Sequence, residues 1–206
     1  MHSGRQMQII LVRHGRPLFS DNAIRASQFG DCLQNYNSAP LDPASPPPTQ
    51  LIELAQHCGK VFCSDLSRSR LSAQWLLASG NEREHAIFRE MELPYANFPS
   101  PKLSPYTWII VFRVLWLLGY KRKCESARAA RQRAVFAARY LQHEAQQLIH
   151  LDSAHGAEPS LSRSMMLVGH GLLNRFIAKQ LRKDGWHGPT SIGSQFWAYS
   201  VFKKAL

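Results

Sequence analysis

Residues 8–15, which read QIILVRHG, constrain the fold of this chain more than any other stretch. Residues 8–12 are uncharged and four of these five are aliphatic, a pattern typical of a strand buried on both faces. The run leads directly into Arg13, His14 and Gly15. In open α/β sheets, ligands bind beyond the carboxyl ends of the strands. Arginine suits phosphate, histidine can act as a nucleophile, and glycine lets a ligand approach the backbone, so the stretch indicates a phosphate-handling site.

A second stretch, far along the chain, repeats this pattern. Residues 164–171, SMMLVGHG, again place an apolar strand before a histidine, His170, that is flanked by glycine. The residues that follow have the spacing of an amphipathic helix. If both strands belong to one parallel sheet, their carboxyl ends lie at the same edge of it. We therefore expect His14 and His170 to meet in one pocket.

Three motifs, in this order along the chain, resemble those of the histidine phosphatase superfamily, the phosphoglycerate-mutase-like proteins. Residues 11–15, LVRHG, match its Arg-His-Gly hallmark. Residues 64–70, SDLSRSR, look like its second arginine motif, and residues 168–171, VGHG, look like its second histidine motif. The resemblance implies a phosphoglycerate-mutase-like fold. The alternation of strand and helix patterns itself predicts an α/β three-layer sandwich with a mainly parallel central sheet, and residues 1–206 are expected to form a single catalytic domain.

The resemblance also implies a role for each motif residue. His14 would attack phosphorus and form a phosphohistidine. Arg13, Arg68 and His170 would surround the phosphate oxygens, with the phosphate charge raising the pKa of His170 so that it is protonated. Arg68 follows a Ser-Asp-Leu-Ser capping sequence and is expected in the first turn of a helix, where free N–H groups favour anions, whereas Arg70 is expected at the surface. No metal ion or organic cofactor is implied.

Two glutamates compete for the role of proton donor to the leaving group. Glu90 and Glu92 follow an expected short strand that begins at residue 86, and alternate residues of an extended segment share a face, so periodicity does not separate them. Residues 88–90, FRE, look like the tripeptide in which many relatives carry their donor, which favours Glu90. Pro94 departs from the family pattern and could turn the loop so that Glu92 reaches the pocket instead.

Ser20 has two interpretations. It falls where mutases of the superfamily place a phosphate-binding asparagine, and its hydroxyl could hydrogen-bond a phosphate oxygen. It also precedes Asp21 and Asn22 in a sequence typical of a helix N-terminus, for a helix that is expected from about Ile24 to Tyr36.

The charge balance favours an anionic ligand. Lys plus Arg outnumber Asp plus Glu by 25 to 14, which gives a formal net charge of +11. The basic residues are spread out without a groove-reading motif, so we expect a phosphorylated small molecule or phosphoprotein as substrate rather than nucleic acid. The four cysteines form no CxxC pair and no zinc-ligand spacing, and residues 1–6 carry no apolar signal core. Together these features predict a cytoplasmic protein with reduced thiols.

Residues 108–119 form the one long apolar run. The run is shorter than the ~20 residues that span a bilayer, and it contains Arg113 near its middle, so a buried helix is expected. Docking on a membrane surface or on a partner protein, through the segment between Trp108 and Leu118, is the alternative.

These observations favour a phosphomonoester hydrolase that acts through a phosphohistidine without a metal ion. The chain lacks the longer insertions of the glycolytic mutases, which is the reason to place a phosphatase before a phosphomutase of the same superfamily. A third hypothesis is that the protein has this fold but is not catalytic, and binds a phosphorylated ligand or a partner protein. The substrate class stays open at this point among sugar phosphates, nucleotides, phosphoproteins and phospholipid-derived headgroups, and the sequence does not predict an oligomeric state.

Overall fold

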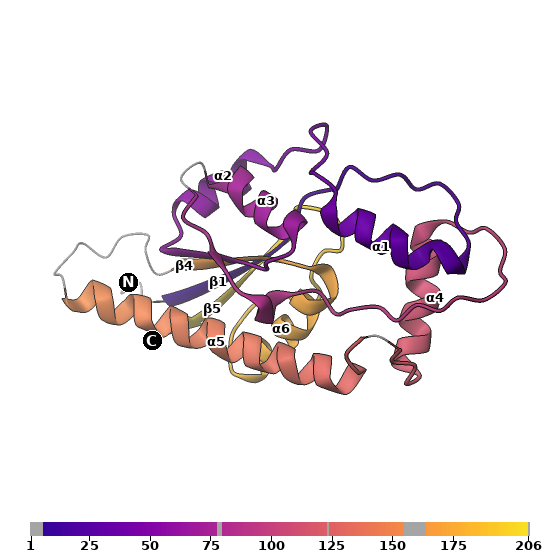
Figure 1. Cartoon of the computed structure of the whole chain (residues 1–206). Helices are drawn as coiled ribbons and strands as arrows, with labels where there is room; N and C mark the ends of the chain where they lie inside the picture. Colours follow the sequence, from indigo (N-terminus) through magenta and orange to yellow (C-terminus); the bar gives the residue numbers. More distant parts are fainter. Residues whose placement is uncertain (1–5, 78–79, 123, 155–163, 206) are drawn as a thin grey trace.

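The strands assemble into one sheet, which Figure 1 shows in a computed structural model that describes residues 6–77, 80–122, 124–154 and 164–205. The five strands are β1 (Gln6–Arg13), β2 (Lys60–Cys63), β3 (Arg83–Glu84), β4 (Ser164–Gly169) and β5 (Tyr199–Ala205), in the spatial order β3-β2-β4-β1-β5. Neighbours pair in parallel except β5, which runs antiparallel to β1 at the edge. The expected mainly parallel sheet is confirmed.

The register between β1 and β4 brings the two histidine motifs together. Val12 pairs with Val168 and Arg13 pairs with Gly169, so both strands end at the same level. The backbone N–H of His14 then donates to the carbonyl of Gly169 at 3.0 Å. This continuation of the ladder places the two loops side by side.

Helices cover both faces of the sheet and complete the three layers, as expected (Figure 1). Helices α2 (Thr49–Gln56) and α3 (Ser67–Leu76) lie on one face, and α5 (Ala127–Ala154) and α6 (Gly171–Lys183) lie on the other. Alternate residues of each strand pack against the two helix layers, because successive side chains of a strand point to opposite faces of the sheet. Ile10, Val12, Met166 and Val168 pack on the α2 and α3 side, while Ile9, Leu11, Met165 and Leu167 pack on the α5 and α6 side.

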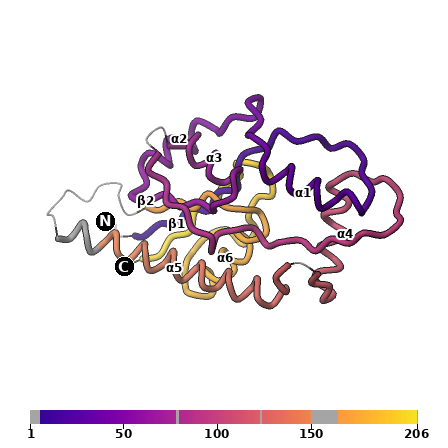
Figure 2. The backbone as a smooth tube through the Cα atoms, viewed as in Figure 1, coloured from indigo at the N-terminus to yellow at the C-terminus, as the bar shows by residue number. Residues whose placement is uncertain are grey.

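A separate pair of helices extends the molecule beyond the end of the sheet where β1 ends. These are α1 (Phe29–Ser38), which follows a 3-10 turn at Ala26–Gln28, and α4 (Pro105–Leu117), and they lie beside each other in Figures 1 and 2. Phe29 and Phe112 stack between them with ring centroids 4.8 Å apart. The site therefore has the sheet on one side and this helix pair on the other.

The helix expected from about Ile24 begins later. A 3-10 turn occupies Ala26–Gln28 and the α-helix starts only at Phe29.

The strand expected from residue 86 is wrong. The chain pairs with β2 only at Arg83–Glu84 and then forms a 3-10 turn at Ala86–Phe88. The His85 side chain accepts a hydrogen bond from the backbone N–H of Ile87, which caps that turn and ends the extended conformation. Glu90 and Glu92 therefore follow a turn and not a strand.

The apolar helix α4 is only half buried, which corrects the expectation of a buried helix. Trp108, Phe112 and Trp116, four residues apart, face the interior. On the outer side, Ile110 is 65% exposed and Leu118 is 80% exposed. The tryptophans of the segment are thus not part of its exposed surface. Among the described residues, no helix is long and apolar enough to cross a membrane.

Candidate active site

The imidazole of His14 is buried at the end of β1 and held in one tautomer. Its Nδ1 lies 2.8 Å from the carbonyl oxygen of Gly15, which can only accept, so Nδ1 donates. Its Nε2 accepts a hydrogen bond of 3.2 Å from Nε of Arg68. With the proton on Nδ1, the lone pair of Nε2 is the nucleophilic one.

Arg68 comes from the first turn of α3 and is 4% exposed. Besides His14, its guanidinium contacts two residues of α1: Nη1 donates to Oδ1 of Asn37 at 2.5 Å, and the Tyr36 ring lies 5.0 Å from Cζ. Sequence reasoning gave neither Tyr36 nor Asn37 a role, because nothing in the local pattern of α1 marks a residue that contacts a distant arginine. Burial lowers the pKa of Arg68 from its usual value.

His170 is fully buried directly before α6, with its ring centroid 5.2 Å from that of His14. Its Nε2 lies 2.7 Å from Oγ of Ser64, whereas its Nδ1 has no hydrogen-bond partner within the described part of the chain. Ser64 belongs to the second arginine motif but was expected to cap a helix. The structure instead has Leu66 at the cap position and places the Ser64 hydroxyl against His170.

Arg13 presents a second buried polar atom without a partner in the described part of the chain. Its Nε is buried without a hydrogen-bond partner among the residues that the structure describes, while its Nη1 donates to the backbone carbonyl of Ser194. The Arg13 guanidinium also lies over the ring of Phe196, 4.4 Å from the centroid. A Cβ at Gly171 would lie 3.6 Å from Arg13 Nε, so the start of α6 is close by.

The segment before β5 forms one wall of the site. The strand begins only at Tyr199, and Trp197 adopts a positive φ of 61° that ends the extended path. Phe196 contacts the His14 ring at 5.6 Å between centroids, and the backbone N–H of Trp197 donates to the carbonyl of Arg13. The sequence shows that residues 196 and 197 are aromatic, but Phe196 and Trp197 lie beside the Arg-His-Gly motif only because the chain bends at Trp197.

Packing also requires glycine at position 15, a reason that the local sequence did not reveal. A Cβ at position 15 would overlap the indole ring of Trp197. The Gly15 N–H donates to Oγ of Ser72 at 2.8 Å, and that hydroxyl donates to the carbonyl of Arg68 at 2.6 Å. The loop after β1 is thereby fixed to α3.

Electrostatics disfavour protonation of both site histidines in the free protein. Burial is the largest cause and the charge of Arg68 the second, and together they lower the pKa of His14 and of His170 well below 6.5. A phosphate dianion between the arginines would act in the opposite direction. Protonation of His170 therefore requires the ligand's own charge.

The structure separates the two candidate acids. Glu90 is partly buried, and its carboxylate accepts hydrogen bonds from the backbone N–H groups of Leu173 (3.1 Å, to Oε1) and Leu172 (3.3 Å, to Oε2). These are the first-turn amides of α6, the helix that follows His170. Glu92 is exposed, and its charge acts on Arg89 and Cys124 instead.

The remaining candidates lie outside this constellation. Ser20 is exposed and its Oγ accepts only the backbone N–H of Asn22, at 3.4 Å, among the interactions of the described residues. It does not cap a helix. Arg70 is exposed, as expected, and lies 3.8 Å from Glu84. Within residues 6–77, 80–122, 124–154 and 164–205, no three His, Cys, Asp or Glu side chains gather as a metal site would require.

The fold is similar to that of solved structures of phosphatases and hydrolases. Mycobacterial glucosyl-3-phosphoglycerate phosphatase aligns with a TM-score of 0.56 at 17% identity, over 97% of this chain and 91% of that one. Its complex with VO3 aligns with a TM-score of 0.53 at 18% identity, over 95% and 92%. Mycobacterial hydrolase 1 gives 0.54 at 18% identity, over 97% and 92%. The sequence matches no protein-family model and no curated protein.

These alignments cover nearly the whole chain and confirm the phosphoglycerate-mutase-like fold. The chain thus shares the fold of these solved phosphatase and hydrolase structures, as the resemblance of its three motifs implied.

Proposed function

We propose that this protein is a phosphomonoester hydrolase that acts through a phosphohistidine on His14. The observation that carries the proposal is the pairing of a fixed nucleophile with unpaired donors. His14 Nε2 bears the lone pair, which faces Arg68, and Arg13 Nε and His170 Nδ1 are buried polar atoms without partners among the described residues. A buried unpaired donor costs about 1–3 kcal/mol, a cost that a bound anion removes.

The first step transfers the phosphoryl group to the protein. Arg68 releases Nε2 of His14 and donates to a phosphate oxygen, after which Nε2 forms a bond to phosphorus as the ester P–O bond breaks. The Nδ1–H group keeps its proton and continues to donate to the Gly15 carbonyl, which supports the positive charge that develops on the ring. Arg13 and His170 donate to the other equatorial oxygens.

Glu90 is the proposed proton donor in this step. It gives its proton to the oxygen that leaves, through Oε2, which has the longer of its two hydrogen bonds to α6. A water molecule then attacks phosphorus and returns a proton to Glu90. The P–N bond breaks, and inorganic phosphate and neutral His14 result.

The positive charge in this scheme comes from side chains, so we propose that no metal ion takes part. Arg13, Arg68 and ligand-protonated His170 supply the charge that a divalent cation would otherwise supply. A structural neighbour that is a phosphatase, and that has been solved with VO3, supports the same reaction class.

Turnover of phosphomonoesters without added metal is the direct test. We expect release of inorganic phosphate, inhibition by vanadate and unchanged rates in EDTA. Rapid quenching at neutral pH with labelled substrate should trap phosphate on His14. Transfer of the label to an added alcohol instead of water would assign a mutase. Loss of activity in EDTA that a divalent cation restores would overturn the metal-free mechanism.

A further inference from the structure

Glu90, the proposed proton donor, lies in a stretch of chain without regular secondary structure. Residues 89–102 form neither helix nor strand. The Glu90 carboxylate accepts hydrogen bonds from the backbone N–H groups of Leu172 and Leu173. The backbone that carries it has no strand ladder or helix to fix it over residues 89–102. Proton transfer depends on a well-placed donor, so the contacts that hold this backbone matter to the proposed reaction.

Arg133, on α5, binds the backbone that leads to the Glu90 side chain. Its Nη1 donates to the carbonyl oxygens of Ile87 (2.9 Å) and Arg89 (2.7 Å). Its Nη2 donates to the carbonyl oxygen of Glu90 itself (3.4 Å). Three of the four carbonyls of residues 87–90 thus bind one guanidinium, which holds this segment against α5.

Glu125 fixes the orientation of that guanidinium. Its carboxylate accepts a hydrogen bond of 3.2 Å from Nε of Arg133 and a second one from Nη2, which together form a two-pronged ion pair. With the three backbone carbonyls, each of the five N–H donors of Arg133 has an acceptor. A lysine has three donors on one nitrogen and could not make this set of bonds. The arrangement therefore depends on the shape of the arginine as well as on its charge.

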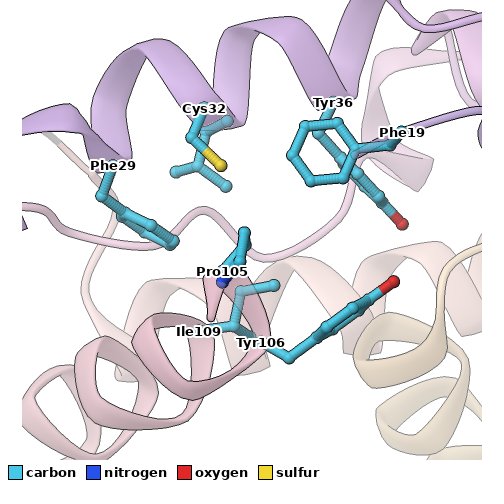
Figure 3. Close-up of a pocket in the computed structure, with 8 residues that line it drawn as sticks. Phe19, Phe29, Cys32, Tyr36, Pro105, Tyr106 and Ile109 are labelled. Carbon is cyan, nitrogen blue, oxygen red and sulfur yellow. The ribbon is translucent and has the colours of Figure 1, made fainter. Parts of the chain in front are cut away.

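Arg113, the arginine that interrupts the apolar run of α4, binds the next carbonyl along the chain. Its Nη2 donates to the carbonyl oxygen of Met91 at 3.1 Å. Helix α4 is itself packed against α1, where apolar side chains such as Phe29 and Ile109 face each other (Figure 3). Arginines from two helices thus bind the carbonyls of two successive residues, Glu90 and Met91.

We propose that Arg133 is a positioning residue that holds Glu90 where it can protonate the leaving group. The inference rests on the proposed function, because it takes Glu90 as the proton donor. The five hydrogen bonds of Arg133 go to three backbone carbonyls and to Glu125, so Arg133 acts on the Glu90 carboxylate through the chain that carries it. Without the guanidinium this chain can shift, and a displacement of about 1 Å is enough to cost ~100-fold in rate.

Arg133→Gln, with Arg139→Gln as its matched control, tests this role in turnover. Arg139 is exposed on the same helix. We expect Arg133→Gln to lower kcat/KM by ~10- to 100-fold for an alkyl ester, and much less for a nitrophenyl ester, whose leaving oxygen needs no proton. Arg139→Gln should change neither rate. An equal loss for both esters would indicate a general structural defect, and that result, or no loss at all, would overturn the proposal.

Two further variants separate positioning from charge. In a Glu90→Gln background, Arg133→Gln should cause no further leaving-group-dependent loss, because the donor that it positions is already gone. Arg133→Lys keeps the charge but not the five hydrogen bonds, so its ratio of rates for the two esters should equal that of Arg133→Gln. An additive loss in the double variant, or the parent ratio in the lysine variant, would contradict the proposal.

The backbone amides of Leu172 and Leu173 report the position of Glu90 without any turnover. In nitrogen–proton correlation spectra of the free protein, Glu90→Gln should move both amide resonances, because it removes a charged acceptor. Arg133→Gln should move them in the same direction, and Arg139→Gln should leave them in place. If the parent protein hydrolyses no phosphomonoester but this pattern appears, the hydrolase is wrong and the positioning stands. If Arg133→Gln leaves both resonances unchanged, the positioning is wrong whatever the turnover.

Discussion

Arg68 donates its Nε hydrogen bond to Nε2 of His14, the same nitrogen that we propose attacks phosphorus. In the proposed mechanism, the nucleophile His14 and the phosphate-binding Arg68 are hydrogen-bonded to each other in the free protein. When phosphate binds, Arg68 donates to a phosphate oxygen instead, and His14 Nε2 faces phosphorus. The contact fixes the ring orientation without using the Nδ1–H group, which donates to the Gly15 carbonyl. Three of the predictions below follow from this arrangement.

Replacement of His14 should abolish hydrolysis. His14 is buried, so His14→Asn is preferable to alanine because it keeps a polar group of moderate size in the cavity. We expect turnover to fall to background and no labelled phosphate to be trapped on the protein, while circular dichroism reports an intact fold. Hydrolysis at the parent rate by this variant would rule out the phosphohistidine.

Arg68→Ala should lower kcat/KM by about 10²–10³-fold, the scale of losing one preorganised donor to developing charge. Arg70→Ala is the matched control, two residues along the same helix, because Arg70 is exposed and its ion pair with Glu84 contributes little. Steady-state kinetics on one ester decide the matter. Similar losses in both variants would mean that the first turn of α3 does not bind phosphate.

Glu90→Gln should cost ~10²-fold or more with an alkyl ester, whose leaving oxygen needs a proton, and much less with a nitrophenyl ester. Glu92→Gln is the control, since Glu92 is exposed. The ratio of rates for the two esters is the informative measurement. A larger, leaving-group-dependent loss in Glu92→Gln would transfer the role to that residue.

The free protein should lose stability in mild acid. Burial and Arg68 lower the pKa of His14 and His170 well below 6.5 in the folded state, and unfolding restores their ordinary values. The unfolded chain then binds more protons as pH falls below about 6.5, so the free energy of unfolding decreases, by up to ~1.4 kcal/mol per pH unit for each histidine. Denaturant titrations between pH 8 and pH 5 measure this slope, and His170→Asn should make it shallower. An unchanged slope in that variant would contradict the assignment to His170.

Gly15→Ala should destabilise the fold by about 1–3 kcal/mol, the usual cost of forcing extra volume into a packed site. The added Cβ would overlap the Trp197 indole, which has to move. Gly171→Ala is the control, because a Cβ there meets nothing nearer than 3.6 Å. Thermal unfolding of the two variants gives the comparison, and equal melting temperatures would show that Trp197 adapts freely.

The sequence predicted the parts of this structure that local pattern determines. The apolar runs that became β1 and β4 and the two histidine loops were recognisable, because a buried parallel strand needs a continuous run of aliphatic residues. The position of Arg68 at a helix start was recognisable from the Ser-Asp-Leu-Ser sequence that precedes it. The fold class follows from these elements alone.

Residues that reach the site from distant segments could not be predicted. Tyr36 and Asn37 contact Arg68 only because α1 packs beyond the end of the sheet, and Phe196 reaches Arg13 only because the chain bends at Trp197. Glu90 and Glu92 were indistinguishable because an extended segment was assumed. In the structure, the His85 side chain caps a 3-10 turn at Ala86–Phe88, which ends the extended conformation before the chain reaches Glu90.

The antiparallel pairing of β5 with β1 determines when, during folding, Arg13 gains the contacts that hold its side chain. Arg13 is held by the carbonyl of Ser194 and by the ring of Phe196, more than 180 residues further along the chain. Loop closure over such a separation comes late, since its entropy cost precedes any gain from contacts. A chain still in synthesis can carry the complete Arg-His-Gly motif and yet have an unsupported arginine. Competence to bind phosphate is therefore a property of the finished chain, acquired when β5 docks on β1.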